Sequence, residues 1–389
     1  MSKYVIEDVT LTAIADAVRE KTGGTELILV SELPTAIAGI EAGGGGNAPT
    51  AEELTFSGSL NGMFNYNLWN WFLEKYKNDI VFENVTGAQN MFNGNITEDL
   101  SCFTIPFNKA YINSMFSNAT ELKKLPKVNG VIDRMFASLF YGAYLLPSDE
   151  INNFFSDLTV MDGSSNCQFN GVFSGCQSAR NITPALEWIH TWINTNSNLN
   201  LSSPSHSSMF SYTYALDTLE SVPVPYVGSA STAKTSNSFG STFSNCYRLK
   251  DVIFATDNGT PYVVRWKSQT IDLSSYVGWS TGDGYITGYN SGITTDKKVS
   301  NSSTYAALKD DPDWYAVQSA YSRYNHDSAV RTINSLPDTS AYLATQTGST
   351  NTIKFKGASG SMTDGGAINT LTEEEIAVAT AKGWTVTLV

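Results

Sequence analysis

The chain has 389 residues, with 24 Lys or Arg against 37 Asp or Glu, so its formal net charge is −13. This acidic balance argues against nucleic acid as a ligand, because such binding draws its affinity from clustered Lys and Arg. The length and apolar content are sufficient for two or three domains with buried cores. No segment approaches the roughly 20 apolar residues of a membrane span, and MSKYVIEDVT lacks the basic start and apolar run of a secretory signal. We therefore expect neither membrane insertion nor export through a signal peptide.

Residues 1–42 predict a helical hairpin. Thr10 and Ser31 are in position to cap two short helices, and the sequence KTGG ends the first of them. The apolar stripes are Leu11, Ile14, Ala15 and Val18 on the first helix, and Leu33, Ile37 and Ile40 on the second. Two helices of this size cannot enclose a core alone, so we expect the hairpin to dock onto copies of itself or onto another protein. Residues 43–50, which include four consecutive glycines, predict a flexible linker.

A repeated phrase begins after the linker. SMFSNATELKKLP at 114–126 returns in varied form around six phenylalanines at intervals of 20 to 37 residues, which indicates stacked supersecondary units. The sixth and ninth residues after four of them are apolar, which predicts one inward-facing corner per turn of a flattened coil. The six phenylalanines are Phe92, Phe116, Phe136, Phe173, Phe210 and Phe243. The apolar followers are Leu122 and Leu125, Ala179 and Ile182, Leu216 and Leu219, and Leu249 and Val252.

The flanking segments predict caps for this stack. LTFSGSL (54–60) is typical of a strand, and YNLWNWFLEKY (66–76) of a helix with Leu68, Trp71 and Phe72 on one face. TINSLP (332–337) aligns with ELKKLP (121–126), and a helix capped by Thr372 precedes a closing strand at 384–389. Stacked repeats need such caps to cover their terminal apolar faces.

We therefore predict an α+β fold: a short N-terminal helical hairpin followed by a capped leucine-rich-repeat-like solenoid. The domains are the hairpin at 1–42, the linker at 43–50, and the N-cap with the solenoid at 51–275. An excursion rich in Gly, Tyr and Ser follows at 276–330, and the final repeats with a C-terminal cap occupy 331–389.

The phrase MFSNCxxLxxLP resembles the BspA-type leucine-rich repeat, which is common in bacterial surface proteins and phage tail proteins. The segment VTLTAIADAVREKTGGTELILVSELPTAIAGI is similar to a short module that opens many tail and baseplate-associated proteins of phages infecting Gram-positive gut bacteria. The segment NTIKFKGASGSMTDGGAINTLTEEEIAVATAKGWTV resembles the end of such proteins. The resemblance implies a phage tail-fibre or receptor-binding protein, located in the virion and frequently trimeric.

Catalytic and metal-binding motifs are scarce. His190, His206 and His326 show no metal-ligand spacing, and the four cysteines form no C-x-x-C pair, which favours small core residues over a disulfide or zinc site. Asp310, Asp311 and Asp313 beside Trp314 are the best carboxylate cluster for glycan hydrolysis, but a solvated turn ranks first and a calcium site second. We predict no enzyme activity, no metal and no cofactor.

Six aromatic residues in or beside the excursion are candidates for ligand binding, because aromatic faces near amides and hydroxyls suit sugars or protein loops. The alternative is that they form a small aromatic core. The six are Trp266, Trp279, Tyr285, Tyr289, Trp314 and Tyr315. Trp188 and Trp192, four residues apart, are instead predicted to lie on one buried helix face.

The expected function is attachment: residues 1–42 bind a phage tail or baseplate protein, and the solenoid binds a host cell-surface glycan or protein. A homo-oligomer is expected, with a trimer as the first choice. Two alternatives remain open, a bacterial cell-surface adhesin of the same repeat type and a tail-associated glycan hydrolase.

Overall fold

The computed structural model describes residues 49–134, 136–160, 168–195, 206–213, 215–224, 237–246, 249–274, 324, 326–355 and 371–389. The chain divides into two compact units, Met1–Thr55 and Phe56–Val389. The predicted hairpin at 1–42 lies outside the described residues, as do most of the linker and most of the excursion at 276–330. Nearly all of the strands and helices that follow belong to the second unit.

The strands are β1 (Thr55–Ser59), β2 (Val81–Gly87), β3 (Thr104–Tyr111), β4 (Lys127–Arg134), β5 (Leu158–Val160), β6 (Thr218–Val222), β7 (Asp251–Phe254), β8 (Thr256–Asp257), β9 (Thr260–Pro261), β10 (Thr270–Leu273), β11 (Asn351–Phe355) and β12 (Trp384–Leu388). The helices are η1 (Asn67–Trp69), α3 (Asn70–Tyr76), α4 (Ser148–Ser156), α5 (Thr183–Thr195), α7 (His326–Ser335), α8 (Ser340–Leu343) and α9 (Glu373–Ala381). Among the described residues, no helix is both long and apolar enough to cross a bilayer.

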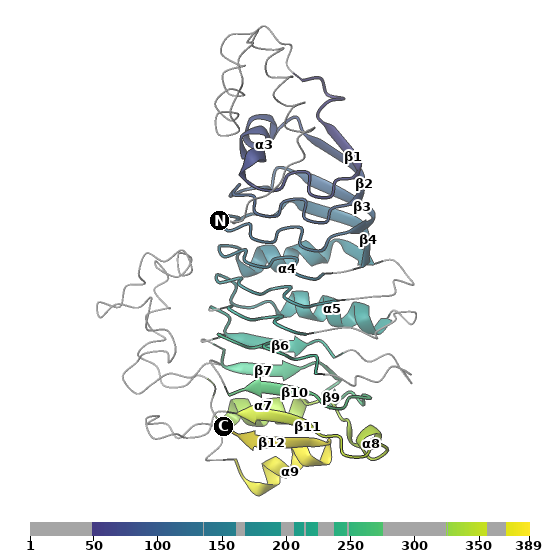
Figure 1. The fold of residues 1–389 in the computed structure, drawn as a ribbon, viewed down its shortest axis with the longest axis vertical. Helices are drawn as coiled ribbons and strands as arrows, with labels where there is room; N and C mark the ends of the chain where they lie inside the picture. The colour runs from purple at the N-terminus through teal and green to yellow at the C-terminus, as the bar shows by residue number, and fades with distance from the viewer. Residues whose placement is uncertain are drawn as a thin grey trace, which may run out of the picture. The chain divides into compact units, whose positions relative to one another are not determined.

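Parallel pairing dominates the sheets. In the five-stranded sheet, with order β1-β2-β3-β4-β5, parallel ladders join β2 to β3, β3 to β4 and β4 to β5. β6 pairs with β7, and β10, β11 and β12 form a three-stranded sheet, all in parallel. Because each strand of the first sheet pairs with the next strand in the chain, the chain advances by one strand per circuit, as Figure 1 shows.

The predicted fold class, an α+β chain with a helical hairpin and a capped leucine-rich-repeat-like solenoid, is wrong. The described strands belong to four separate sheets of five, three, two and two strands rather than to one continuous sheet. Helices α4 and α5 occupy two of the intervals between strands, and an isolated β-bridge joins Asn181 to Thr218 of β6. No helical hairpin lies within the described part of the chain.

A column of seven stacked phenylalanine rings forms the core of the region between β1 and β7. Each ring lies 5.7 to 6.2 Å from the next, and the planes of successive rings are inclined by 1° to 24°. Every member is at most 1% exposed. The column consists of Phe64, Phe92, Phe116, Phe140, Phe173, Phe210 and Phe243.

The column confirms five of the six predicted anchors and corrects one. Phe140, not Phe136, stacks between Phe116 and Phe173. Phe136 is also buried, but it stacks on Phe169 in a separate contact. Phe64 is an additional first member of the column and is not among the six predicted anchors. The eight predicted apolar followers are all buried, which confirms their inward orientation.

The predicted caps are confirmed in part. Strand β1, helix α3, helix α9 and strand β12 all form where the sequence predicts them. Thr372 caps α9 in a capping box, in which its hydroxyl accepts the Glu375 N–H and the Glu375 carboxylate accepts the Thr372 N–H. However, Leu68 is 67% exposed, and Leu73 is the buried residue of α3. Most of TINSLP belongs to helix α7, so it does not repeat the 121–126 segment.

The cysteines are free thiols where the structure describes them. Cys176 and Cys246 are buried, as predicted, and burial raises the pKa of the Cys246 thiol to about 12. Cys102 is exposed, which corrects the prediction of a core position, and Cys167 lies outside the described residues.

Candidate functional site

Seven six-residue turns surround the phenylalanine column, and the surface that they form is called the turn face here. Phe is the fourth residue of each turn. The turns are 61–66, 89–94, 113–118, 137–142, 170–175, 207–212 and 240–245. Their sequences are NGMFNY, QNMFNG, NSMFSN, ASLFYG, NGVFSG, SSMFSY and GSTFSN.

The second and sixth residues of every turn have a positive φ, between 52° and 77°. Such left-handed backbone suits Gly and Asn best, because a Cβ atom crowds the backbone there and only short polar side chains offset this locally. The second residues are Gly62, Asn90, Ser114, Ser138, Gly171, Ser208 and Ser241, and the sixth are Tyr66, Gly94, Asn118, Gly142, Gly175, Tyr212 and Asn245. Tyr66 and Tyr212 are therefore unusual, since they are bulky residues in this conformation.

Backbone groups of the turn face bond mainly to one another. In each pair of adjacent turns, the second, fourth and sixth N–H groups donate to the first, third and fifth carbonyls of the next turn, at 2.5 to 3.2 Å. Within each of the second to seventh turns, the fifth N–H donates to the second carbonyl, as Asn93 does to Asn90 at 3.2 Å. These N–H groups are therefore occupied, and a ligand on this face would be recognised mainly by side chains.

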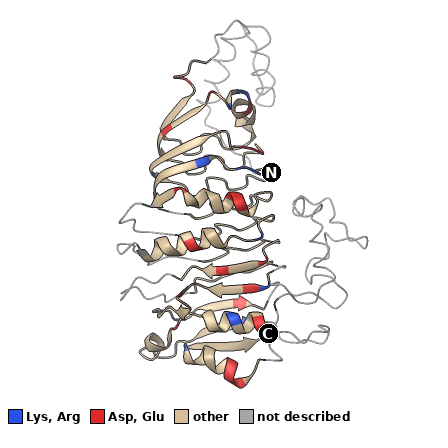
Figure 2. Ribbon diagram, turned by 180° about the vertical axis from the view of Figure 1, so that it is seen from behind, with Lys and Arg blue, Asp and Glu red and all other residues tan. Residues whose placement is uncertain are grey.

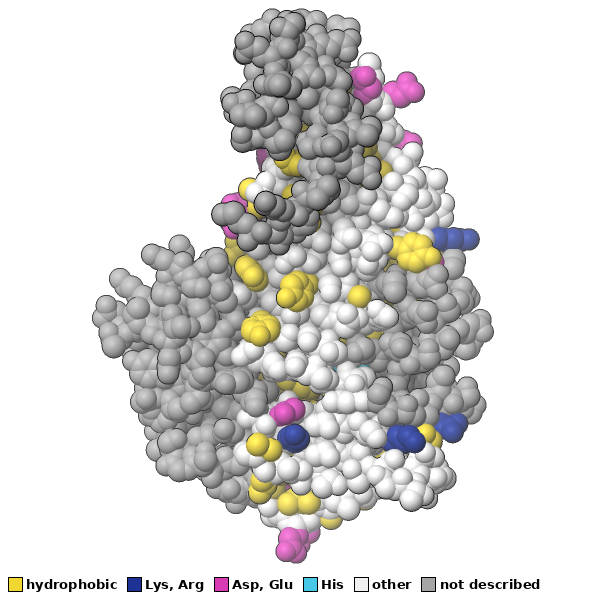
Figure 3. Space-filling view, in the orientation of Figure 1, with side chains coloured by type: hydrophobic (Ala, Val, Ile, Leu, Met, Phe, Trp, Pro, Cys, Tyr) yellow, Lys and Arg dark blue, Asp and Glu magenta, His cyan; other side chains and the backbone are white. Residues whose placement is uncertain are grey.

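The side chains of the turn face carry no charge, although the chain as a whole has a net charge of −13. No Lys, Arg, Asp, Glu or His occurs in the seven turns. Figure 2 shows acidic residues on helices such as α4 and α9, and the face in Figure 3 has few charged side chains over the described residues. Three tyrosines, Tyr66, Tyr141 and Tyr212, are 41%, 45% and 50% exposed.

A hollow of about 410 Å³ lies between the first two turns. Five amide side chains and one tyrosine line it. They are Asn61, Asn65, Tyr66, Gln89, Asn90 and Asn93. Its volume falls in the range of about 300 to 1,000 Å³ that is typical of small-molecule sites, but its lining is polar and uncharged.

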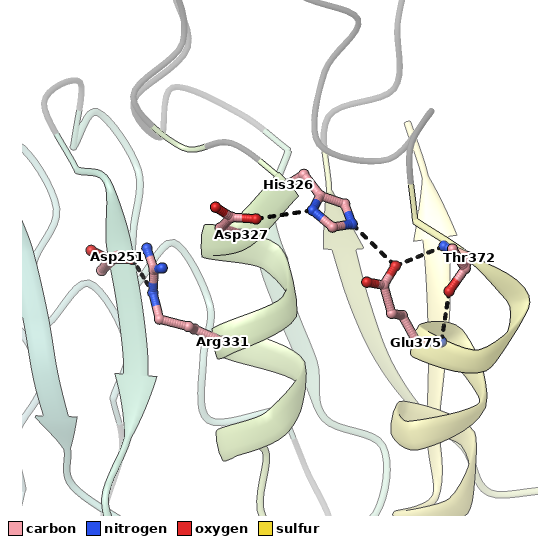
Figure 4. A network of polar contacts seen from close by, with 6 residues as sticks. All are labelled: Asp251, His326, Asp327, Arg331, Thr372 and Glu375. Atoms are coloured by element: carbon pink, nitrogen blue, oxygen red, sulfur yellow. Dashed lines mark hydrogen bonds and ion pairs between the residues drawn. The ribbon is translucent and has the colours of Figure 1, made fainter.

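A second cluster of polar side chains joins α7, α9 and β7 (Figure 4). His326, at the start of α7, contacts Asp327 through Nδ1 and Glu375 of α9 through Nε2, each at 3.1 Å. Arg331, one turn further along α7, pairs with Asp251 of β7, where its Nε donates to Oδ1 at 2.9 Å. The hydrogen bonds to Asp327 and Glu375 raise the pKa of His326.

The His326 cluster is best explained as a structural contact between helices. Glu375 already accepts the Thr372 N–H in the capping box, which is the leading cause of its lowered pKa. Among the described residues, His326 bonds to the carboxylates of Asp327 and Glu375 and to no Ser, Thr or Cys side chain that it could activate as a nucleophile. Within the same part of the chain, no group of three His, Cys, Asp or Glu is arranged to hold a metal ion.

The second histidine with a resolved shift, His190, is part of the packing between α5 and its neighbours. Its Nδ1 accepts the Val224 N–H at 3.3 Å, and its ring lies 5.2 Å from that of Tyr262. Burial lowers the pKa of His190 to about 4. The ring is therefore neutral near pH 7, which fits its role as an acceptor.

Of the six predicted binding aromatics, only Trp266 lies among the described residues. It is 2% exposed and packs against Phe239 at 5.5 Å, so it is a core residue and presents no open face to a ligand. Trp279, Tyr285, Tyr289, Trp314 and Tyr315 lie outside the described residues, as do Asp310, Asp311 and Asp313. Trp188 and Trp192 stack on each other at 6.3 Å and both contact Phe136, which confirms their shared helix face.

The exposed tyrosines of the turn face did not emerge from the sequence as candidates. The signal that identifies two of them is the pair of left-handed positions on either side of each phenylalanine, where Tyr66 and Tyr212 interrupt a run of Gly, Asn and Ser. Comparison of the chain with protein families, with curated proteins and with solved structures gave no match.

Proposed function

We propose that the chain is a phage tail-fibre or receptor-binding protein, and that it binds a host cell-surface receptor through the turn face. The observation that carries the proposal is the absence of charge from seven consecutive turns of a strongly acidic chain. A surface of amides, hydroxyls and separate tyrosines forms hydrogen bonds and stacks on flat groups without attracting ions. The resemblance of the two ends of the chain to tail proteins supports the viral assignment.

Binding is favoured over hydrolysis for this surface. Glycoside hydrolases generally need two carboxyl groups about 5 to 10 Å apart, and the seven turns contain no Asp or Glu. A receptor-binding surface needs no catalytic group, only a shape and hydrogen-bonding groups that match the receptor over several turns.

The proposal is tested by measuring how the labelled full-length chain binds to a panel of Gram-positive gut bacteria. The double variant Tyr141→Glu/Tyr212→Glu places two charges on the turn face at exposed sites. We expect wild type to bind at least one strain and the double variant to bind it about tenfold or more weakly, since desolvating unpaired charge is costly.

A matched control introduces charge elsewhere. Thr104 and Asn108 are exposed on β3, outside the turn face. The variant Thr104→Glu/Asn108→Glu should bind cells as wild type does. Failure of the wild type to bind any strain, or equal loss of binding in both double variants, would contradict the proposal.

A further inference from the structure

The hollow between the first two turns differs from the rest of the turn face in its concentration of amides. Asn61, Asn65, Gln89, Asn90 and Asn93 provide five carboxamide groups around it. At the corresponding first, second and fifth positions, the fourth turn has Ala137, Ser138 and Tyr141, and the sixth has Ser207, Ser208 and Ser211. The first two turns thus differ from these turns in their side chains, although their second and sixth residues also have a positive φ.

Hydrogen bonds within the lining hold some of these amides in place. Asn61 Oδ1 accepts the Gln89 N–H at 2.9 Å, and Asn93 Nδ2 donates to Asn90 Oδ1 at 3.1 Å. The side chains of Asn65 and Gln89 form no hydrogen bond with another described residue. Each carboxamide carries both a donor and an acceptor, so the hollow offers groups of both kinds on a partly ordered frame.

Tyr66 forms an aromatic wall of the hollow. Its N–H donates to the Asn93 carbonyl at 2.7 Å, which fixes its backbone to the second turn. Its ring lies against Gly94, where an added Cβ atom would be 3.0 Å from Tyr66 Cδ1. Glycine at this position therefore leaves room for the ring, which is still 41% exposed.

We propose that this hollow binds a neutral sugar ring, with Tyr66 as the stacking platform and the amides as hydrogen-bond partners for sugar hydroxyls. A pyranose has an apolar C–H face and a rim of hydroxyl groups, which matches an aromatic ring beside paired donors and acceptors. The lining has no cation to favour an anionic ligand, and no carboxylate to favour a cationic one. The inference rests on the proposed function, because it names the chemical class of receptor that the turn face recognises.

The inference is tested by NMR titration of the full-length chain with glucose, galactose, mannose, rhamnose and N-acetylglucosamine, with glucuronate as the anionic comparison. We expect at least one neutral sugar to bind with a Kd on the order of millimolar, and glucuronate to bind more weakly than this sugar. Tyr66→Ala and Gln89→Ala should each weaken binding about tenfold, the effect of about 1.4 kcal/mol. Tyr66→Phe should retain binding, because it keeps the ring.

Tyr342→Ala is the matched control, since Tyr342 is a partly exposed tyrosine of α8, outside the turn face. It should bind the sugar within about twofold of wild type. The inference is overturned if no neutral sugar of the panel binds, or if Tyr342→Ala weakens binding as much as Tyr66→Ala does. It is also overturned if Tyr66→Ala binds like wild type.

Cell binding, measured in parallel, separates this inference from the proposed function. A chain that binds bacteria but none of the sugars overturns the sugar site and leaves receptor binding intact. A chain that binds a sugar in the hollow but no bacterium supports the site and contradicts the receptor assignment.

Discussion

At the scale of the residue, the phenylalanine column accounts for the repeated phrase in the sequence. Phe116 lies 5.7 Å from Phe92 and 5.8 Å from Phe140, with nearly parallel planes, and Phe154 of α4 meets its edge. An aromatic side chain at this point fills the space between two adjacent circuits of the chain. Its loss would leave a cavity that the backbone hydrogen bonds on either side prevent from closing.

Phe116→Ala should therefore destabilise the protein by about 3 to 5 kcal/mol, the range for truncating a buried aromatic side chain. Urea denaturation followed by circular dichroism measures the change. Tyr141→Ala, at a 45% exposed site, serves as the control and should cost much less. An unfolding midpoint that is the same for Phe116→Ala and wild type would exclude Phe116 from the column.

Gly130 in β4 illustrates a second constraint at the same scale. Its φ is +94°, and an added Cβ atom would lie 2.2 Å from the Phe107 carbonyl oxygen of the neighbouring strand. Gly58 in β1 also has a positive φ, +75°, but nothing lies within 4 Å of its added Cβ. Both glycines thus have a positive φ, but only at Gly130 would an added Cβ atom clash with a neighbouring strand.

Gly58→Ala should cost about 1 to 2 kcal/mol from backbone strain alone. Gly130→Ala should cost clearly more, because the clash with Phe107 forces the strands apart. Thermal melts of both variants test the comparison, and equal melting temperatures would show that the close approach of β3 and β4 has no energetic consequence.

At the scale of the element, the contacts of His326 with Asp327 and Glu375 link the start of α7 to the start of α9. The folded-state pKa of His326 is raised above its ordinary value of 6.5. The stabilisation is therefore fully present below about pH 6.5 and is lost as pH rises through the folded-state pKa. His190 has the opposite dependence, because its lowered pKa removes stability as pH falls from 6.5 towards about 4.

The variant His326→Gln isolates the pH-dependent stabilisation that comes from His326. The difference in melting temperature between wild type and this variant should be larger at about pH 5.5 than at about pH 8.5, since only the protonated ring forms ion pairs. Wild type alone is not sufficient, because His190 contributes a slope of the opposite sign. A difference that does not change with pH would mean that His326 is not paired as an ion.

The elements also show how far the sequence could predict this fold. The burial of the residues six and nine positions after a phenylalanine depends only on the local turn between them, which the sequence pattern captures. The predicted burial of Leu122 and Leu219 is accordingly confirmed. The segment RMFASLF offers two phenylalanines, and the match to the repeated Met-Phe phrase favours Phe136. The left-handed positions at Ser138 and Gly142 place Phe140 in the column instead.

The fold class was wrong for a related reason. The repeated turns determine where the phenylalanines stack, but not what fills the intervals between them. α4 lies between β4 and β5, which pair in one sheet, whereas α5 lies between β5 and β6, which belong to separate sheets. The candidate site could not be predicted from the sequence for a similar reason. Gly, Asn and Ser in the turns are explained by the left-handed backbone alone, so their presence does not by itself indicate a ligand.

At the scale of the whole molecule, the chain divides into Met1–Thr55 and Phe56–Val389, and the glycine run at 43–46 belongs to the first unit. The apolar stripes predicted for residues 1–42 are too short to bury each other. We therefore expect these residues to mediate assembly, with a homotrimer as the first expectation and docking onto a tail protein as the alternative.

Deletion of residues 1–46 should leave a folded, monomeric chain, whereas the full-length chain should form a homo-oligomer at micromolar concentration. Multi-angle light scattering on both forms tests this. A monomeric full-length chain would contradict the predicted homo-oligomer. A truncated chain that remains oligomeric would show that the interface lies within Phe56–Val389 instead.

The central claim, that the turn face contacts the receptor, is tested most directly by hydroxyl-radical footprinting of the protein on envelope fragments from a strain that it binds. The account predicts that Tyr66, Tyr141 and Tyr212 become protected from oxidation, while Tyr262 and Tyr342, which lie outside the turn face, do not. Unchanged oxidation of all three turn-face tyrosines in the bound protein would contradict the claim.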